Sequence, residues 1–399
     1  MELQTLCSAP SFDLSQDARM EARRMFENRY VWLPGRLADT ILFVVLILAA
    51  TSARASDLTQ RLLESGRMQF AAGNYKQAES YLRRSVAEAG NGGASDTELV
   101  LCLGDLSNLL LIQGKTDESE VFLDRAIVIL KSRPTVDRRQ LPILLGLLGT
   151  LYQKTGRLEQ TEAVLNEAQH LGKKLLADEP LHLSDIYNDL GVLHLQTGKL
   201  KQAESDFKTA LALVGKVKNL EVESTDRRST ILANLSAMYF VQEKWSLGEQ
   251  TLIHSIEIVE RTHGSEHPIV CALLDNLGLL YFKQNDLVGA ETVLRRELAI
   301  RRTVFGLENA STASAAATLA NVLVARNEYE EAGSLFAEAL KTQEQVLGRG
   351  PEVATTLDQF ANLLRRTHRD DLAGDMASRA ESIRFESAYT VSVKTRRDR

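Results

Sequence analysis

Very few residues in this chain are spaced as a catalytic or cofactor site requires. The segment Gly114-Lys115-Thr116 looks like the end of a phosphate-binding loop, whose backbone N–H groups and lysine hold phosphate oxygens. That loop needs another glycine five residues before Gly114, and Leu109 occupies this position. We therefore predict that Gly114 lies in a turn between two helices and binds no phosphate.

A pair of histidines is the nearest approach to a metal site. His263 and His267 are four residues apart, but a glycine-containing linker separates them, so they do not share one helical face. No third ligand stands nearby in the sequence, although a zinc site needs at least three protein ligands. Neither a Gly-x-Ser-x-Gly nucleophile elbow nor a His-Glu-x-x-His motif is present. The sequence thus predicts no catalytic residue, no metal and no cofactor, and we expect that the protein is not an enzyme.

The overall charge gives no indication of nucleic-acid binding. The chain has 399 residues, with 47 Lys and Arg against 53 Asp and Glu, a formal net charge of −6. Nucleic-acid-binding domains carry a basic patch that neutralises phosphates, and this composition does not indicate one. The contents of 25% charged and 6% aromatic residues are ordinary for a soluble helical protein. We expect a protein or peptide partner and no nucleic acid.

The elements that would position any site are helices, most clearly over residues 183–214. Two segments with apolar residues at helical spacing are interrupted there by Thr197-Gly198-Lys199, which predicts two helices joined by a tight turn. Gly191 in the first helix and Ala203 in the second are small, as the close approach of two helices requires. Phe207 supplies a large apolar side chain to the apolar stripe.

This pattern recurs along the chain. If Gly191 is taken as an anchor position, the equivalent residues follow one another at intervals of 41 to 45. They are Gly66, Ser107, Gly149, Gly191, Ser236, Gly278, Ala320 and Ala361. A small residue stands twelve places after each anchor, and Leu or Phe stands sixteen places after every anchor but the last. Nineteen places after each anchor stands Ser or Ala, except for Glu297, which we expect to disturb the packing of its helix.

The repeated pattern resembles the tetratricopeptide repeat, a helix-turn-helix unit with small residues at fixed places. The signature of that family is a small residue, an aromatic residue, alanine, an aromatic residue or leucine, and alanine. Gly191, His194, Ala203, Phe207 and Ala210 stand at these places. The resemblance implies an all-α fold, a right-handed α-solenoid (superhelix) of about eight such repeats.

The length of the repeat indicates a subtype. The period is about 42 residues, whereas the minimal repeat of the family has 34. The linkers at residues 264–268 and 348–351, and the segment 273–281, are similar to those of kinesin-light-chain repeats. We expect this subtype of repeat, without any implication that the protein is a motor subunit.

The repeats account for most of the chain. We predict an unstructured leader or misassigned start at residues 1–36, with Met20 or Met25 as alternative starts, and an apolar segment at 37–55. The solenoid is expected over residues 56–389, followed by a mobile basic tail at 390–399. The predicted repeats are residues 59–89, 98–131, 141–176, 182–217, 227–262, 268–304, 310–346 and 352–388.

Residues 37–55 have the features of a secretory signal peptide. Their unbroken apolar run, Ile41–Ala50, has ten residues, whereas a helix needs about 20 to span a bilayer. A basic flank precedes the run, and Ala53-Arg54-Ala55 before Ser56 fits a cleavage site. We expect cleavage after Ala55 and a periplasmic or extracellular mature chain. The alternatives are an uncleaved membrane anchor and a chance resemblance.

In the tetratricopeptide repeat family, the first helix of each repeat lines a concave groove in which partners usually bind. By that resemblance, the groove is lined by the residues two and three places before each anchor and one place after it. Asn and Asp recur there although both are poor helix formers, and an amide side chain can bond a peptide backbone of any sequence. The candidate peptide-binding residues are Asn108, Asn188, Asp189, Asn234, Asp275, Asn276, Asn321 and Asn362. The alternative is that these side chains bond neighbouring helices or water.

These observations favour a non-catalytic protein-interaction scaffold that holds a peptide or partner segment in the groove. Chaperone-binding members of the family hold a terminal carboxylate with Lys and Arg, and the corresponding positions, six and three before each anchor, have neither residue. An acidic or polar groove suits a basic or neutral extended segment better. The alternative functions are a regulatory subunit and a self-associating component of an envelope-associated assembly or secretion system.

Overall fold

The computed structural model of the protein describes residues 56–133, 136–217 and 222–397. The leader predicted at residues 1–36 and the signal segment predicted at 37–55 lie outside the described residues. Every secondary-structure element within the described ranges is a helix. None of these helices is both long enough and apolar enough to cross a membrane.

The helices form consecutive pairs, in which a short turn joins the first helix to the second. The second helices of successive pairs begin 41 to 45 residues apart, which is the spacing of the anchor positions. The pairs are residues 56–71 with α3 (Tyr75–Glu88), α4 (Asp96–Ile112) with α5 (Thr116–Ser132), α6 (Gln140–Lys154) with α7 (Leu158–Leu175), α8 (Pro180–Gln196) with α9 (Leu200–Val214), α10 (Val222–Val241) with α11 (Trp245–His263), α12 (Pro268–Lys283) with α13 (Leu287–Phe305), α14 (Ala310–Ala325) with α15 (Tyr329–Leu347), and α16 (Pro351–Arg366) with α17 (Asp370–Arg397).

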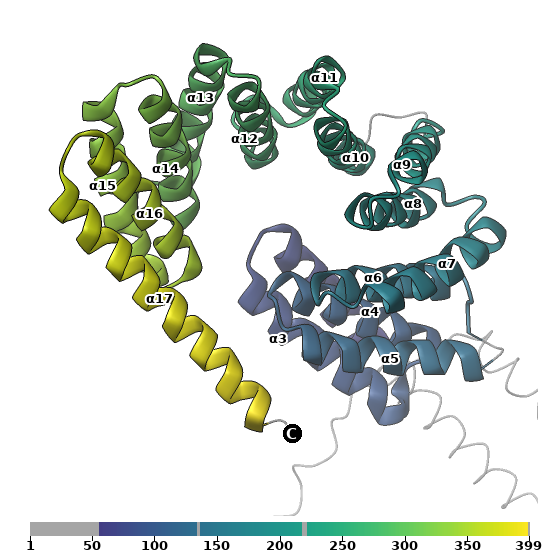
Figure 1. Ribbon diagram of the computed structural model, residues 1–399. Coiled ribbons are helices and arrows are strands. Elements are labelled where there is room, and N and C mark those ends of the chain that lie inside the picture. Colours follow the sequence, from purple (N-terminus) through teal and green to yellow (C-terminus); the bar gives the residue numbers. More distant parts are fainter. Residues whose placement is uncertain (1–55, 134–135, 218–221, 398–399) are drawn as a thin grey trace, which may run out of the picture. The chain divides into compact units, whose positions relative to one another are not determined.

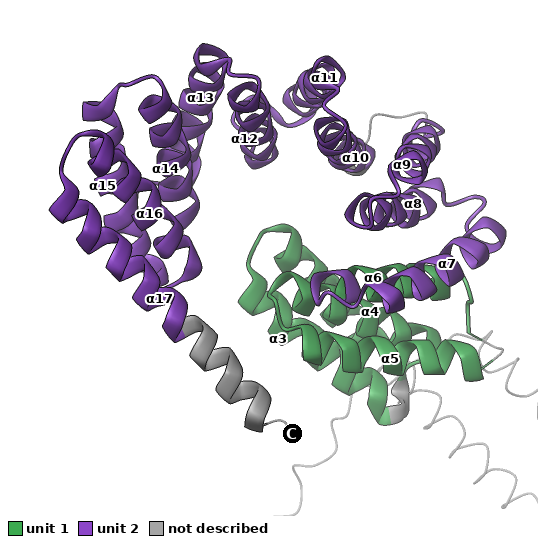
Figure 2. Cartoon of the chain, viewed as in Figure 1, with its two compact units in different colours: residues 1–151 green, residues 152–399 purple. Residues whose placement is uncertain are grey.

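The chain separates into two compact units at Leu151, inside α6 (Figure 2). In the second unit, which begins at Tyr152, the first helices of successive pairs follow one another (Figure 1). Helix α8 contacts α10, α10 contacts α12, and α14 contacts α16. We call the surface formed by α8, α10, α12, α14 and α16 the first-helix face.

The two helices of a pair approach most closely at the anchor position. Gly191 on α8 faces the ring of Phe207 on α9, and a Cβ atom built on Gly191 would lie 2.5 Å from the Cε1 atom of Phe207. Phe207 is fully buried, and burying a phenylalanine side chain contributes about 1.5–3 kcal/mol to folding. The same relation joins Gly278 to Leu294, at 2.7 Å. The alternation of small anchor and large residue sixteen places later therefore arises from direct contact.

Two anchors are serine and bind the second helix through their hydrogen-bonding groups. The hydroxyl of Ser236 donates to the backbone carbonyl of Gly248 at 3.0 Å. In the second repeat the direction is reversed, and the hydroxyl of Ser119 donates to the carbonyl of Ser107 at 2.9 Å. The hydroxyl of Ser107 itself donates to the backbone carbonyl of Leu103 in the same helix at 2.6 Å. Since buried hydroxyls must be hydrogen-bonded, the bonds that Ser236 and Ser107 donate allow serine where other repeats have glycine or alanine.

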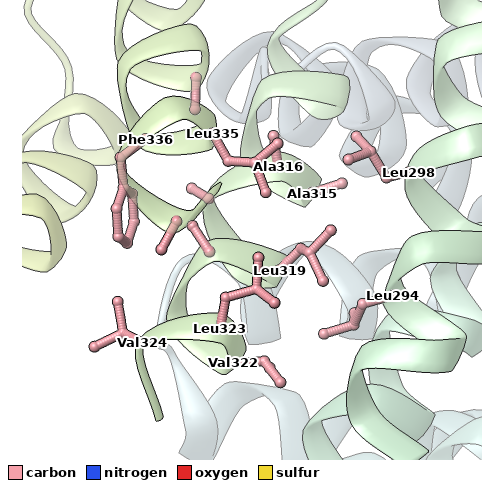
Figure 3. Close-up of a cluster of buried hydrophobic side chains, with 14 of the residues drawn as sticks. Leu294, Leu298, Ala315, Ala316, Leu319, Val322, Leu323, Val324, Leu335 and Phe336 are labelled. Atoms are coloured by element: carbon pink, nitrogen blue, oxygen red, sulfur yellow. The ribbon is translucent and has the colours of Figure 1, made fainter. Parts of the chain in front are cut away.

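The apolar core continues from one pair to the next. Leu294 and Leu298 on α13 pack with the alanine-rich helix α14, and Phe336 on α15 lies in the same cluster (Figure 3). Ala315 and Ala316 contribute small side chains between these larger ones. Each first helix of this cluster is thus buried against the preceding second helix as well as against its own partner.

The turn inside each pair places one residue in the left-handed backbone region, seven places after the anchor. Gly114 is one of these residues, with φ of 76°, which confirms that it forms a turn between two helices. The later repeats use side-chain-bearing residues instead, including Asn285 at φ of 61°. The eight residues are Gly73, Gly114, Gly156, Gly198, Glu243, Asn285, Asn327 and His368.

Two segments singled out by the sequence prediction are helical. Helix α17 runs to Arg397, so it includes residues 390–397 of the predicted tail. No proline or glycine follows Gly374, so no helix-breaking residue interrupts this segment. Glu297 is fully buried in α13, and the helix passes through this position without a break.

The close approach at Gly191 can be tested by adding one methyl group. Gly191→Ala is expected to lower the free energy of unfolding by about 1–3 kcal/mol, because the new Cβ atom meets the buried ring of Phe207. Gly374→Ala is the control, since a Cβ atom at Gly374 meets nothing within 4 Å. It should stabilise α17 by about 0.5–1 kcal/mol through helix propensity alone. Urea unfolding measures both changes, and equal effects would contradict the packing described here.

Candidate functional site

The structure places the eight candidate residues on first helices in both units. Asn108 is exposed on α4 in the first unit. The other seven lie on the first-helix face of the second unit. Helix α8 holds Asn188 and Asp189, α10 holds Asn234, α12 holds Asp275 and Asn276, α14 holds Asn321, and α16 holds Asn362.

Two of the candidates bind each other. The side-chain amide of Asn234 donates to the amide oxygen of Asn188 at 2.9 Å, which joins α10 to α8. Both side chains are half-buried. This bond uses one of the two hydrogens on the Asn234 nitrogen and one lone pair of the Asn188 oxygen, so each amide keeps further donor and acceptor capacity. The pair therefore links neighbouring helices and still presents polar groups to a partner.

The remaining candidates have different environments. Asn276 and Asn362 are exposed on their helices. Asn321 is half-buried, and its amide donates to the backbone carbonyl of Ala317 in the same helix at 3.1 Å. Asp189 is half-buried and takes part in an interaction within the protein. Asn276 is therefore the candidate on α8 to α12 that is most accessible to a partner.

Three aspartates of the first helices have arginine partners. Asp185 on α8 accepts two hydrogen bonds from the Nε atom of Arg227 on α10, at 2.9 and 3.0 Å. In the last pair, Arg384 on α17 binds Asp358 on α16. In the first unit, the Nε atom of Arg67 lies 2.5 Å from a carboxylate oxygen of Asp105 on α4. The first helices are therefore closer to neutral than the count of their acids suggests.

Asp275 has an arginine nearby as well. Burial raises the pKa of the Asp275 carboxyl, and the charge of Arg301 on α13 acts in the opposite direction. Arg301 follows Asp275 by 26 residues, and Arg384 follows Asp358 by the same interval. Our sequence prediction did not include these arginines, although the shared interval within two repeats was a signal that could have found them.

The histidine pair is not arranged as a metal site. The rings of His263 and His267 are stacked, with centroids 4.3 Å apart. The Nε2 atom of His263 lies 2.7 Å from a carboxylate oxygen of Asp226, and the Nδ1 atom of His267 accepts from the backbone N–H of Ile269 at the start of α12. Within the described ranges, no group of three or more His, Cys, Asp or Glu side chains could hold a metal ion.

Cavities are found at other places in the structure. One of about 620 Å³ lies between the π-helical turn η1 (Ala89–Gly93), α4 and α5, and Arg125 and Arg133 are among its lining residues. Another of about 610 Å³ borders Asn327 and Tyr329 at the start of α15. Neither of these two cavities is lined by any of the eight candidates.

Comparisons with known proteins agree with this architecture. A model of the tetratricopeptide repeat family matches residues 140–215, 227–303 and 311–384, which together make up more than half of the chain. The comparison with curated protein sequences gives no match.

Three solved structures illustrate the similarity of fold. BtubC (BKLC) from P. vanneervenii has a TM-score of 0.53 and 17% identity, over 58% of this chain and 92% of that chain. The apo form of the quorum sensor NprR from B. thuringiensis has a TM-score of 0.61 and 11% identity, over 93% of this chain and 99% of that chain. A signal transduction ATPase with a tetratricopeptide repeat sensor from Pyrococcus horikoshii has a TM-score of 0.63 and 12% identity, over 94% of this chain and 54% of that chain. At these identities the similarity concerns the fold alone.

The Asn188–Asn234 bond can be measured by a double-mutant cycle. Asn188→Ala, Asn234→Ala and the double variant should give a coupling energy of about 0.5–1.5 kcal/mol in urea unfolding without any partner. Asn188→Ala combined with Asn276→Ala is the control, because these two residues lie two pairs apart. That control should be additive within about 0.5 kcal/mol. Additivity in both cycles would show that the two amides do not stabilise each other.

Proposed function

Because this chain belongs to the tetratricopeptide repeat family, we propose that it is a protein-interaction scaffold without catalysis of its own. In this proposal, the first-helix face binds an extended segment of a partner protein. Family membership agrees with the prediction from the repeats, and the all-α fold of consecutive helix pairs is confirmed as well. The partner and its mode of binding are the proposed part.

A row of polar side chains is the observation that carries the proposal. The position two places before the anchor is polar in every pair of the second unit from α8 onward, and each of these side chains is half-buried or exposed. The residues are Asp189, Asn234, Asn276, Thr318 and Gln359. Packed helices lie about 8–10 Å apart, and an extended peptide advances about 3.3 Å per residue. One polar side chain would then meet roughly every third residue of a bound peptide.

The charges of this face favour a neutral segment. The carboxylates of Asp185 and Asp358 are held by Arg227 and Arg384, so they are not available to attract a basic peptide strongly. Asn234 and Asn276 offer both donors and acceptors, which suit the N–H and C=O groups of a peptide backbone. We therefore expect recognition of an uncharged extended segment chiefly through its backbone.

Two proteins of similar fold support recognition over catalysis. One is described as a quorum sensor and another as an ATPase whose tetratricopeptide repeats form a sensor. The region of that ATPase that is similar to this chain makes up 54% of its length. These descriptions support a recognition role for the repeats of this chain.

Peptide binding provides the test. The intact chain would be used to select binders from a displayed library of random peptides, and selected peptides would be titrated by fluorescence polarisation. The double variant Asn234→Ala/Asn276→Ala should weaken binding about tenfold or more, since two net hydrogen bonds of about 0.5–1.5 kcal/mol are lost. Gln202→Ala/Gln250→Ala, which removes two exposed amides from the second helices α9 and α11, should not change the affinity.

The possible outcomes distinguish peptide binding at the first-helix face from self-association. Equal affinities of both double variants would exclude the first-helix face as the binding site. A library without binders would exclude peptide capture and favour self-association, which light scattering on the same sample would detect.

We further propose that residues 37–55 direct export and are removed. This proposal rests on the short apolar run followed by Ala53-Arg54-Ala55. Expression of the chain with a C-terminal tag in an export-competent bacterium should give a periplasmic product that begins at Ser56, as measured by intact mass. An uncleaved chain in the membrane fraction would indicate an anchor, and an uncleaved chain in the cytosol would contradict export.

A further inference from the structure

The residue type at one position of the repeat changes from small or apolar to polar along the chain. The residue 23 places after the anchor is small or apolar, and buried, in the first five pairs. These residues are Ala89, Leu130, Gly172, Val214 and Val259. In the last three pairs the position holds Arg301, Gln343 and Arg384. Of these three, Gln343 is buried, Arg301 is half-buried and Arg384 is exposed, so this position brings a polar group into the core at α13 and α15.

Glu297 is the most deeply buried charged residue of this region. Its relative exposure is 0%, and its neighbour one turn later on α13, Arg301, donates from Nε to one carboxylate oxygen at 2.5 Å. The other carboxylate oxygen is buried and has no hydrogen-bond partner in the structure. A buried carboxylate with one unbonded oxygen is unfavourable, because the protein replaces only part of its hydration.

Asp275 adds a second negative charge from the facing helix. It lies on α12, which packs against α13, and it is half-buried. We call Asp275, Glu297 and Arg301 the Glu297 cluster. The pKa of Glu297 is raised to about 7, first because burial disfavours the charged carboxylate and then because Asp275 is near, while Arg301 opposes the rise. Two carboxyl groups therefore share one guanidinium group.

Asp275 and Arg301 are the charged groups of the described residues that shift the pKa of Glu297. Helix α14, which packs on the other side of α13, contains no titratable residue between Ala310 and Ala325. Cys271 on α12 is buried, which raises the pKa of its thiol and keeps it neutral. Acids on α11 and α15 form ion pairs with other arginines of α13: Glu260 with Arg296, Glu331 with Arg295, and Glu338 with Arg302.

We propose that Glu297 acts as a proton-controlled latch between α12 and α13. With its proton bound, Glu297 is neutral, and Arg301 balances Asp275 alone. When the proton leaves, the buried interface holds two negative charges and one positive charge, and the two helices separate more readily. This inference concerns the helix pair itself and stands whether or not a peptide binds the first-helix face.

The direction of the pH effect follows from the proton equilibrium. A carboxyl group that holds its proton more tightly in the folded state makes the folded state less stable once that proton is lost. For Glu297, the free energy of unfolding should therefore decrease as the pH rises from 4.5 to about 7, and the full destabilisation should be present above that range. Acidification toward pH 5.5 should tighten the α12–α13 pair.

Hydrogen exchange of the intact chain tests the latch locally. After correction for intrinsic exchange, the opening equilibrium constant of α12 and α13 should be about 10- to 100-fold larger at pH 8 than at pH 5.5. Glu297→Gln, which keeps the shape and removes the charge, should abolish most of this difference and protect the helices at pH 8. Glu257→Gln, at an exposed position of α11, should behave like the wild type.

A direct titration of Glu297 in the wild-type protein tests the proposal even if the Glu297→Gln variant does not fold. In wild-type protein labelled with ¹³C at the glutamate carboxyl groups, the Glu297 signal should titrate with a midpoint near pH 7. A midpoint near 4.5 would overturn the proposal, as would an identical pH dependence of exchange in wild type and Glu297→Gln.

Discussion

The whole arrangement depends on how closely the two helices of a pair can approach. Gly191 lies directly against the ring of Phe207, and no side chain fits between them. Because a buried phenylalanine or leucine fills this interface in every pair but the last, one small and one large residue set how closely the two helices pack. The spacing of the first helices, and with it the row of polar side chains that they present, follows from this repeated contact.

The polar surface and the apolar interior of a first helix are kept apart by its period of 3.6 residues. In one turn of α12, Leu277 is buried in the core and Asn276 is exposed to solvent. Acids that stand beside the amides are balanced by arginines from other helices, as Asp185 is by Arg227. In the proposed function, such a surface would distinguish partners by hydrogen bonding and shape more than by net charge, unlike a groove that captures a carboxylate.

Much of this architecture could be predicted from the sequence, since it depends on local spacing. The anchor at Gly191, its partner Phe207 and the turn at Gly114 all follow from intervals within one repeat. The bond between Asn188 and Asn234 could not be predicted, because it depends on which side chains of two different repeats face each other. Glu297 was expected to disturb the packing of its helix. A nearby arginine, one turn later, instead allows the carboxyl group to be buried, and helix periodicity alone does not reveal that compensation.

The left-handed turns of the first four pairs and of the last four are unfavourable for different reasons. Glycine, as at Gly198, adopts this conformation without strain but loses much backbone entropy when the chain folds. Glu243 and His368 lose less entropy, yet their side chains are strained in the folded turn. Since an entropic contribution grows with temperature and steric strain hardly does, heating weighs more on the glycine turns. The turns of the first four pairs should therefore lose more stability on heating than those of the last four.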